Sequence, residues 1–180
     1  MNIDEIIKEN KLKVKEEIPK EEIKEYDKRG NEIYYRDSEG FEYWQEFDFN
    51  NNEIHYKNSN GTEYWKKYDS NKNEIHYKDS EGFEYWQEYN SNNNKVHYRN
   101  SDGSEYWWEY DSNNNEIHYK NSEGFEYWKK YDSNKNVIHR KDSDGTEYWQ
   151  EYDSNNNLIR TLKKISGIYY LNDLEMEKEE

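Results

Sequence analysis

The dipeptide Tyr-Trp occurs six times along this 180-residue chain, and each copy lies 21 residues after the one before it. The copies are Tyr43-Trp44, Tyr64-Trp65, Tyr85-Trp86, Tyr106-Trp107, Tyr127-Trp128 and Tyr148-Trp149. Glycine recurs in the same phase from Gly40 to Gly145, and histidine from His55 to His139. A short fixed period without insertions is the signature of a tandem repeat whose units stack on their neighbours.

Each unit is predicted to contain two short strands, such as residues 53–57 and 62–68, and two turns. The first turn has the pattern Asx-Ser-x-Gly in all six copies, and its glycine suits the positive φ of a type I turn closed by a G1 bulge. The second turn carries Asn-rich sequences, because asparagine tolerates the left-handed region. Proline is absent from residues 26–160, as a hydrogen-bonded meander requires.

The first turn predicts its own strand register. A three-residue loop places Lys57 opposite Glu63 and His55 opposite Trp65, and it pairs a basic with an acidic residue in every unit. A slip by one residue would lose all six of these pairs. We therefore expect this register throughout the array.

For the second turn we expect the units to stay in phase, with Trp65 beside His76 and Glu63 beside Lys78. Each Glu would then lie between two cations, each Trp between two His residues or their substitute, and each Tyr between two Tyr residues. Strand alternation assigns the Trp and His side chains, with rows of Glu and Lys, to one face. We call it the Trp/His face. The opposite face, the Tyr face, would carry the Tyr ladder together with Ile54 and Tyr68.

These patterns predict an all-β fold, an extended antiparallel β-meander of about 13 strands in a single-layer or superhelical sheet. Residues 26–160 would form the array, with six full units and a partial seventh. Ile3, Ile6 and Ile7 predict a short N-terminal helix, so residues 1–25 are assigned to a helical cap. Residues 161–180 are assigned to a C-terminal cap and acidic tail, because open strand edges need protection. As an alternative, the terminal segments form a homodimer or dock on a partner.

Composition narrows the classes of function. A net charge of −15 disfavours direct binding of nucleic acid and favours a protein partner with a basic surface. The absence of cysteine excludes thiolate metal sites and disulfides. Neither a secretory signal nor a membrane span is predicted, so we expect a cytoplasmic protein, in the producing cell or in a phage-infected host.

The repeated histidines do not predict a metal site or catalysis. Equivalent His positions lie two strands apart, about 9.6 Å, with a Trp between them, whereas shared ligation needs nitrogens within about 2.1 Å of one ion. The carboxylates each face a cation and have no apolar pocket that would raise their pKa. We therefore expect no enzyme, no cofactor and no metal.

Tyr-Asp pairs precede the second turn in most units: Tyr26-Asp27, Tyr68-Asp69, Tyr110-Asp111, Tyr131-Asp132 and Tyr152-Asp153. Followed by Asn-rich turns and an Ile, they resemble the YD repeats of the Rhs family over about three quarters of the chain. The resemblance implies a β-meander or spiral without catalytic residues. A fainter similarity runs to the aromatic cell-wall-binding repeats of secreted Gram-positive proteins, which also combine Gly, Tyr/Trp pairs and Asp-Ser-Asn turns.

The Trp/His ladder has two interpretations, a scaffold of cross-strand aromatic pairs or a recognition surface. The doubled tryptophan Trp107-Trp108 occurs once, in the middle of the array. The predicted binding residues are Trp86, Trp107, Trp108, Trp128, His97 and His118. We expect a non-enzymatic repeat protein that binds another protein through an elongated acidic, aromatic β-surface. The alternatives are a phage-type inhibitor of host defence or nucleic-acid machinery, similar to an anti-CRISPR protein, and a glycan-binding module.

Overall fold

The computed structural model describes residues 8, 21–172 and 174–176, and the elements in them are β-strands joined by turns. The predicted N-terminal helix falls mainly on residues 1–7 and 9–20, which lie outside the described residues. The chain divides into two compact units, Met1–Glu63 and Tyr64–Glu180. Both are all-β, as the sequence predicts.

The first unit is an antiparallel meander in which neighbours in sequence are neighbours in the sheet. Its strands are β1 (Ile23–Tyr26), β2 (Glu32–Arg36), β3 (Glu42–Phe47) and β4 (Glu53–Asn58). Glu63, the first residue of β5, ends this unit.

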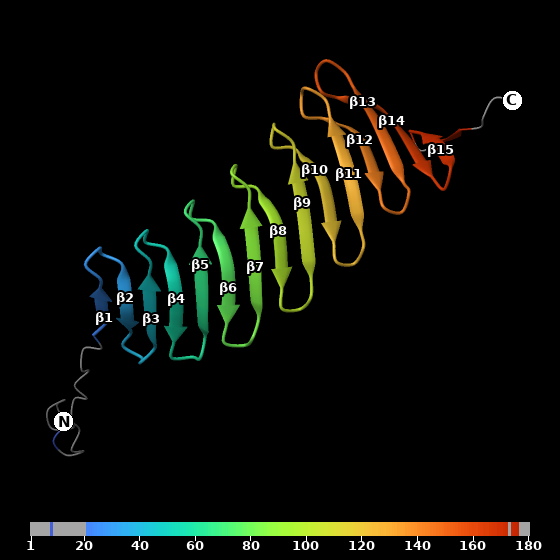
Figure 1. Cartoon of the computed structure of the whole chain (residues 1–180). Helices are drawn as coiled ribbons and strands as arrows, with labels where there is room; N and C mark the ends of the chain where they lie inside the picture. Colours follow the sequence, from blue (N-terminus) through green and yellow to red (C-terminus); the bar gives the residue numbers. More distant parts are fainter. Residues whose placement is uncertain (1–7, 9–20, 173, 177–180) are drawn as a thin grey trace. The chain divides into compact units, whose positions relative to one another are not determined.

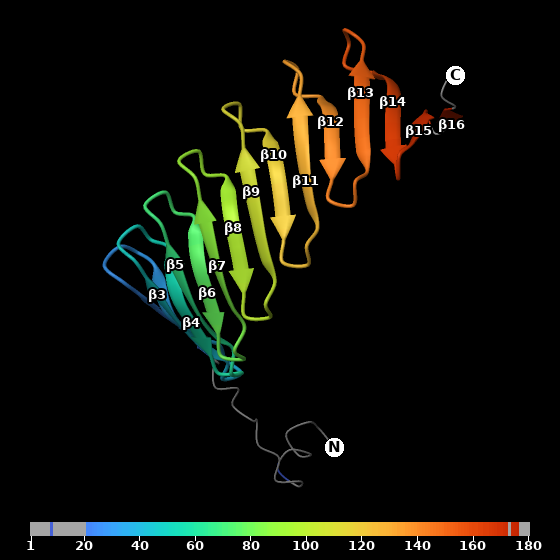
Figure 2. The same ribbon diagram turned by 45° about the vertical axis from the view of Figure 1, so that its right-hand side comes forward.

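The second unit continues the same pattern of consecutive antiparallel strands, which Figures 1 and 2 show side by side in chain order. Its strands are β5 (Glu63–Tyr68), β6 (Glu74–Asp79), β7 (Glu84–Tyr89), β8 (Lys95–Asn100), β9 (Glu105–Tyr110), β10 (Glu116–Asn121), β11 (Glu126–Tyr131), β12 (Val137–Asp142), β13 (Glu147–Tyr152), β14 (Leu158–Ile165), β15 (Ile168–Leu171) and β16 (Leu174–Met176).

The described residues thus contain 16 strands, more than the 13 or so that the repeat count predicted. The additional strands lie at the ends of the array. Ile23 and Lys24 pair with β2, and β15 and β16 extend the meander beyond β14. Pairing therefore continues past the last recognisable repeat residues.

The two turns of each 21-residue repeat share one backbone geometry. In the first kind, Gly103 donates to the carbonyl of Asn100 over 3.2 Å, and in the second kind Asn114 donates to the carbonyl of Asp111 over 3.1 Å. The residue that needs the left-handed conformation is Gly103 (φ 87°) in one and Asn114 (φ 62°) in the other. Both turn assignments from the sequence are confirmed.

The register predicted for the first turn is also confirmed. His97 pairs with Trp107 and Arg99 with Glu105 across β8 and β9. The equivalent hairpins β2–β3, β6–β7, β10–β11 and β12–β13 have the same register.

The register predicted for the second turn is wrong by two residues. Trp86 lies opposite Arg99, not His97, and His97 lies opposite Glu88. One residue of this offset comes from the turn, which closes with Tyr89 opposite Lys95, and the other comes from a β-bulge before His97. This offset keeps the repeated Trp, His and Tyr side chains on their predicted faces but changes their neighbours. The residue before the bulge changes face, because Lys95 pairs with Tyr89.

The offset corrects the predicted surroundings of the repeated glutamates and tryptophans. Trp86, Trp107 and Trp128 each lie between a His on one side and a Lys or Arg on the other. Trp44 lies between Tyr34 and Lys57. Glu84 faces the cation Lys78 on one side only. On its other side, the serine of the following unit completes the backbone ladder. Ser101 N donates to the Glu84 carbonyl over 2.7 Å, and Glu84 N donates to Ser101 Oγ over 3.0 Å.

Ring stacking takes the place of an apolar core. Among the described residues, no hydrophobic side chain is buried. On the Tyr face, Tyr77 stacks on Tyr85 with centroids 5.2 Å apart, and Tyr85 contacts Tyr98 at 5.6 Å. Such cross-strand aromatic contacts contribute about 0.2–1 kcal/mol each, so the sheet is stabilised by many small terms.

The residue after the turn glycine alternates along the chain with a period of 42 residues. The Tyr85 hydroxyl donates to the Glu74 carboxylate, and the same bond recurs from Tyr43 to Glu32 and from Tyr127 to Glu116. Burial, together with this hydrogen bond, raises the pKa of Tyr85 above its usual value. The same units carry a phenylalanine after the turn glycine, at Phe41, Phe83 and Phe125, where the intervening units carry Thr62, Ser104 and Thr146.

Candidate functional site

The six predicted binding residues all lie in the second compact unit of the chain, Tyr64–Glu180. Their strands are β7 (Trp86), β8 (His97), β9 (Trp107 and Trp108), β10 (His118) and β11 (Trp128). Strand pairing brings His97 against Trp107 and His118 against Trp128 on the Trp/His face. Their rings are stacked, with centroids 5.4 Å and 5.1 Å apart and interplanar angles of 15° and 8°.

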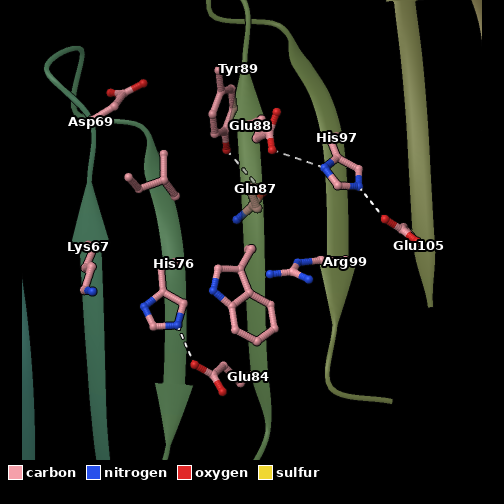
Figure 3. Close-up of a pocket in the computed structure, with 12 residues that line it drawn as sticks. Lys67, Asp69, His76, Glu84, Gln87, Glu88, Tyr89, His97, Arg99 and Glu105 are labelled. Carbon is pink, nitrogen blue, oxygen red and sulfur yellow. Dashed lines mark hydrogen bonds and ion pairs between the residues drawn. The ribbon is translucent and has the colours of Figure 1, made fainter. Parts of the chain in front are cut away.

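Trp86 is covered on both sides by its neighbours. The His76 ring stacks on it at 5.4 Å, and the guanidinium carbon of Arg99 lies 4.4 Å from an indole ring centroid. Figure 3 shows His76 and Arg99 on the strands that flank β7. Arg99 is exposed, and a cation over an indole at an exposed site contributes about 0.5–1 kcal/mol, so Arg99 helps to hold Trp86 in place.

Carboxylates contact the imidazoles along the same face. The Nε2 atom of His97 lies 2.8 Å from Glu105 Oε1, and its Nδ1 atom lies 3.4 Å from Glu88 Oε1 (Figure 3). His118 has the equivalent contacts with Glu126 and Glu109, at 2.7 Å and 3.2 Å. The second contact depends on the register offset, because the offset places Glu88 opposite His97 and Glu109 opposite His118.

His139 departs from this arrangement. Its ring stacks on Trp149 at 5.3 Å, as in the other units. Its Nε2 atom is buried, however, and has no hydrogen-bond partner among the described residues.

An open hollow of about 870 Å³ lies over β5 to β9, mostly on the Trp/His face (Figure 3). Its lining includes the predicted residues Trp86 and His97, together with Arg99. Four carboxylates and two cations line it: Asp69, Glu84, Glu88 and Glu105, with Lys67 and Arg99. With neutral histidines, the hollow therefore carries net negative charge.

The carboxylates around the hollow differ in their access to solvent. The Glu88 side chain is 71% exposed, whereas the His97 side chain that it contacts is 20% exposed. Glu109, one unit further along, is exposed to a similar degree. Glu88 and Glu109 are therefore accessible carboxylates, and the two cations that line the hollow, Lys67 and Arg99, are exposed as well.

Trp108 lies on the Tyr face, as strand alternation predicts. It stacks on Tyr106 at 6.0 Å and contacts Tyr119 at 5.8 Å. The six predicted residues therefore do not form one site. Five belong to the Trp/His face, and Trp108 belongs to an aromatic cluster on the opposite face.

Arg99 and Glu88 were missed as site residues. The sequence assigns Arg99 to a salt bridge with Glu105 and gives no reason to place it over Trp86. Both contacts arise from the two-residue register offset, of which one residue comes from the turn and one from the bulge that leaves Val96 unpaired. A branched apolar residue recurs at this position in every unit, and this is the only signal that the sequence offers.

Within the part of the chain that the structure describes, no group of three His, Asp or Glu residues has the geometry to hold a metal ion. Within the same residues, no helix is long and apolar enough to cross a membrane.

No protein-family model matches the chain, and no curated protein matches it either. Its fold resembles solved structures of toxin complexes. The crystal structure of TcdB2-TccC3-Cdc42 matches with a TM-score of 0.56 at 13% sequence identity. The crystal structure of TcdB2-TccC3 without the hypervariable C-terminal region gives 0.57 at 14%, and the Tc holotoxin pore of Photorhabdus luminescens gives 0.56 at 14%.

Each of these matches covers 95% of this chain and 10% of the other chain. The chain thus spans about a tenth of the length of the proteins that it resembles, and at these identities the likeness describes the fold alone. At that coarse level it agrees with a repeat of the Rhs-type YD kind.

Proposed function

We propose that this chain is a non-enzymatic repeat protein that binds another protein, with the Trp/His face of β6 to β11 as its interface. The observation that supports the proposal most directly is the hollow over β5 to β9, which lies where the sequence predicted recognition. It combines stacked aromatic rings with exposed carboxylates. Tryptophan and arginine are enriched among the residues that dominate protein interfaces.

The charge of the hollow favours a basic partner. A Lys or Arg side chain of the partner would lie between Glu88 and Glu109, with its aliphatic part against the rings of Trp107 and His97. Exposed charges contribute more to association rate and specificity than to affinity, so the rings would carry most of the binding free energy. The interface should therefore weaken only moderately when salt screens the carboxylates.

The test is capture of a partner from a bacterial lysate on the full chain, identification by mass spectrometry, and measurement of its affinity for variants. Trp86→Ala and Trp107→Ala should each weaken the complex at least about tenfold, which corresponds to 1.4 kcal/mol. Trp149→Ala, in the same slot of a terminal repeat, is the matched control and should leave the affinity unchanged. Circular dichroism checks that each variant keeps its β-sheet.

A charge reversal separates the roles of the carboxylates. Glu88→Lys should weaken the complex, whereas Glu81→Lys, which makes the same change in a turn, should not. If both reversals act equally, long-range charge and not the hollow controls binding. If Trp86, Trp107 and Trp149 can all be replaced without loss of affinity, the ladder is a scaffold and the proposal is wrong.

The identity of the captured protein also decides between the alternatives. A nuclease or another nucleic-acid-binding protein would favour inhibition of host defence, and an ordinary basic protein would favour a general interaction role. Retention on a polysaccharide column, with no protein captured, would favour glycan binding and contradict the proposal.

A further inference from the structure

The sixth repeat breaks the Tyr ladder on the face opposite the proposed interface. Arg140 stands where the five preceding units carry Tyr35, Tyr56, Tyr77, Tyr98 and Tyr119. Val137, on the same strand, stands where four of those units carry a glutamate and one carries Lys95. A cation has therefore replaced a ring, and an aliphatic side chain has replaced a charged one, in one place.

These substitutions coincide with a hollow of about 330 Å³ on the Tyr face. It is lined by Lys129, Val137, Arg140, Asp142, Tyr148 and Gln150, from β11, β12 and β13. Arg140 lies opposite Lys129 on one side and opposite Tyr148 on the other. Its guanidinium carbon lies 4.5 Å from the centroid of the Tyr127 ring.

Two cations therefore meet at a single ring. Lys129 Nζ also lies 4.5 Å from the Tyr127 centroid, and it is directly opposite Arg140 in the sheet. Like charges in directly opposed positions destabilise a sheet unless an anion lies between or beside them. In every other equivalent pair, a Gln, Lys or Trp faces an uncharged Tyr or Thr, as Gln87 faces Tyr98.

Each of these two cations already has one carboxylate partner. Lys129 Nζ lies 3.0 Å from Glu116 Oε1, and Arg140 Nε donates to Asp142 Oδ1 over 2.6 Å. Asp142 is 8% exposed, so this carboxylate is covered and already engaged. A guanidinium has five N–H donors, and within the described residues the bond from Nε is the one hydrogen bond that Arg140 makes.

We infer that this hollow binds an oxyanion, a carboxylate or phosphate group, between Arg140 and Lys129. The planar guanidinium would present its free Nη donors to two oxygens of the anion, and the ammonium would supply a second charge. Lys163, whose Nζ lies 5.4 Å from the Tyr148 ring centroid, adds a third cation at the edge of β14. This inference is independent of the proposed interface, because the hollow lies on the opposite face and in other repeats.

The experiment is a titration of the full ¹⁵N-labelled chain with sodium phosphate and, separately, with sodium glutarate, at constant ionic strength set by sodium chloride. The Nε–H signal of Arg140 and the side-chain amide of Gln150 report on the hollow. We expect saturable shifts with a dissociation constant of roughly 1 mM for at least one of the two anions. The anion that binds with the higher affinity indicates whether the natural ligand carries a phosphate or a carboxylate group.

Arg140→Tyr restores the residue of the other repeats, so it should fold and should abolish the saturable shifts. Arg140→Lys keeps the charge but loses the planar fork, and it should weaken binding at least fivefold. Arg160→Gln, which removes a cation bonded to Glu151 on the Trp/His face, is the control and should leave the titration unchanged. Absence of saturation with both anions, or equal saturation in Arg140→Tyr, would overturn the inference.

Discussion

At the scale of single residues, backbone conformation explains why so few positions of the repeat vary. Eight glycines have φ between 85° and 97°, and each lies in a turn where an added Cβ would meet no atom within 4 Å. Space is therefore not what requires glycine here. The requirement is the left-handed backbone, which costs a residue with a side chain about 1 kcal/mol.

Substitutions in the two kinds of turn should therefore differ in their effect on the free energy of unfolding. Gly82→Ala should lower the free energy of unfolding by about 1 kcal/mol, because φ at this position is 97°. Lys135→Gly, at a position with φ 67°, should not lower it, because the strain it relieves offsets the added freedom of the unfolded chain. Urea unfolding of both variants measures this, and a larger loss from Lys135→Gly would contradict it.

At the scale of the element, one Asp or Asn side chain organises each second turn, and it is a carboxylate in every copy except Asn90. Asp132 Oδ1 accepts from the backbone N–H groups of Asn134 and Asn136, and Oδ2 accepts from the Asn136 side chain. The Asn136 side-chain bond, followed by the backbone bonds, lowers the pKa of Asp132 below its usual value despite some desolvation. The same lowering affects Asp69, Asp111 and Asp153.

Because these carboxyl groups have a lower pKa in the folded state than in the unfolded state, the free energy of unfolding depends on pH. The contribution of these carboxylates is complete above their unfolded pKa, about 4, and is lost as the pH falls through the lower folded values. Asn90 occupies the same slot naturally and keeps both backbone bonds. Asp132→Asn should therefore fold at neutral pH and lose less stability on acidification to about pH 3 than the parent chain. Equal acid sensitivity of the two chains in urea titrations would contradict this.

The first turn depends on its serine in a way that the Asx-Ser-x-Gly pattern did not reveal. Ser122 Oγ accepts from the N–H of Glu105, which has no other strand neighbour on that side. Ser122→Ala should cost about 1 kcal/mol and speed hydrogen exchange at the Glu105 amide. Ser112→Ala, in the neighbouring second turn, is the matched control and should change neither quantity.

How far the sequence could predict the fold is clearest in the two registers. The first follows from charge pairs such as Arg99 with Glu105, which a slip would destroy. The second could not be derived in this way, because the bulge at Val96 and its equivalents leaves one residue unpaired, and no pair of charges in the sequence marks that position. The sequence therefore predicts which rings lie on the Trp/His face. It does not predict their partners across the second turn, which are Arg99 over Trp86 and Glu88 beside His97.

At the scale of the whole chain, the 42-residue alternation predicts which repeats can be removed. Deleting residues 68–109 removes two units and keeps units with phenylalanine and units with a small residue in alternation. Deleting residues 89–109 removes one unit but makes the units of Phe83 and Phe125 adjacent. Each repeat normally adds stability, yet we expect the shorter chain to melt at least about 4 °C higher. Melting followed by circular dichroism tests this, and the reverse order would show that 21 residues are the complete structural unit.

The lack of buried hydrophobic side chains among the described residues has a thermodynamic consequence. The heat capacity change of unfolding arises mainly from apolar surface that becomes hydrated, and here most rings already contact water on one side. Scanning calorimetry should therefore give a value well below the roughly 2 kcal/mol/K expected for a globular chain of this length. The free energy of unfolding would then vary little with temperature. Cooling would weaken the fold far less than it weakens a protein with a buried apolar core.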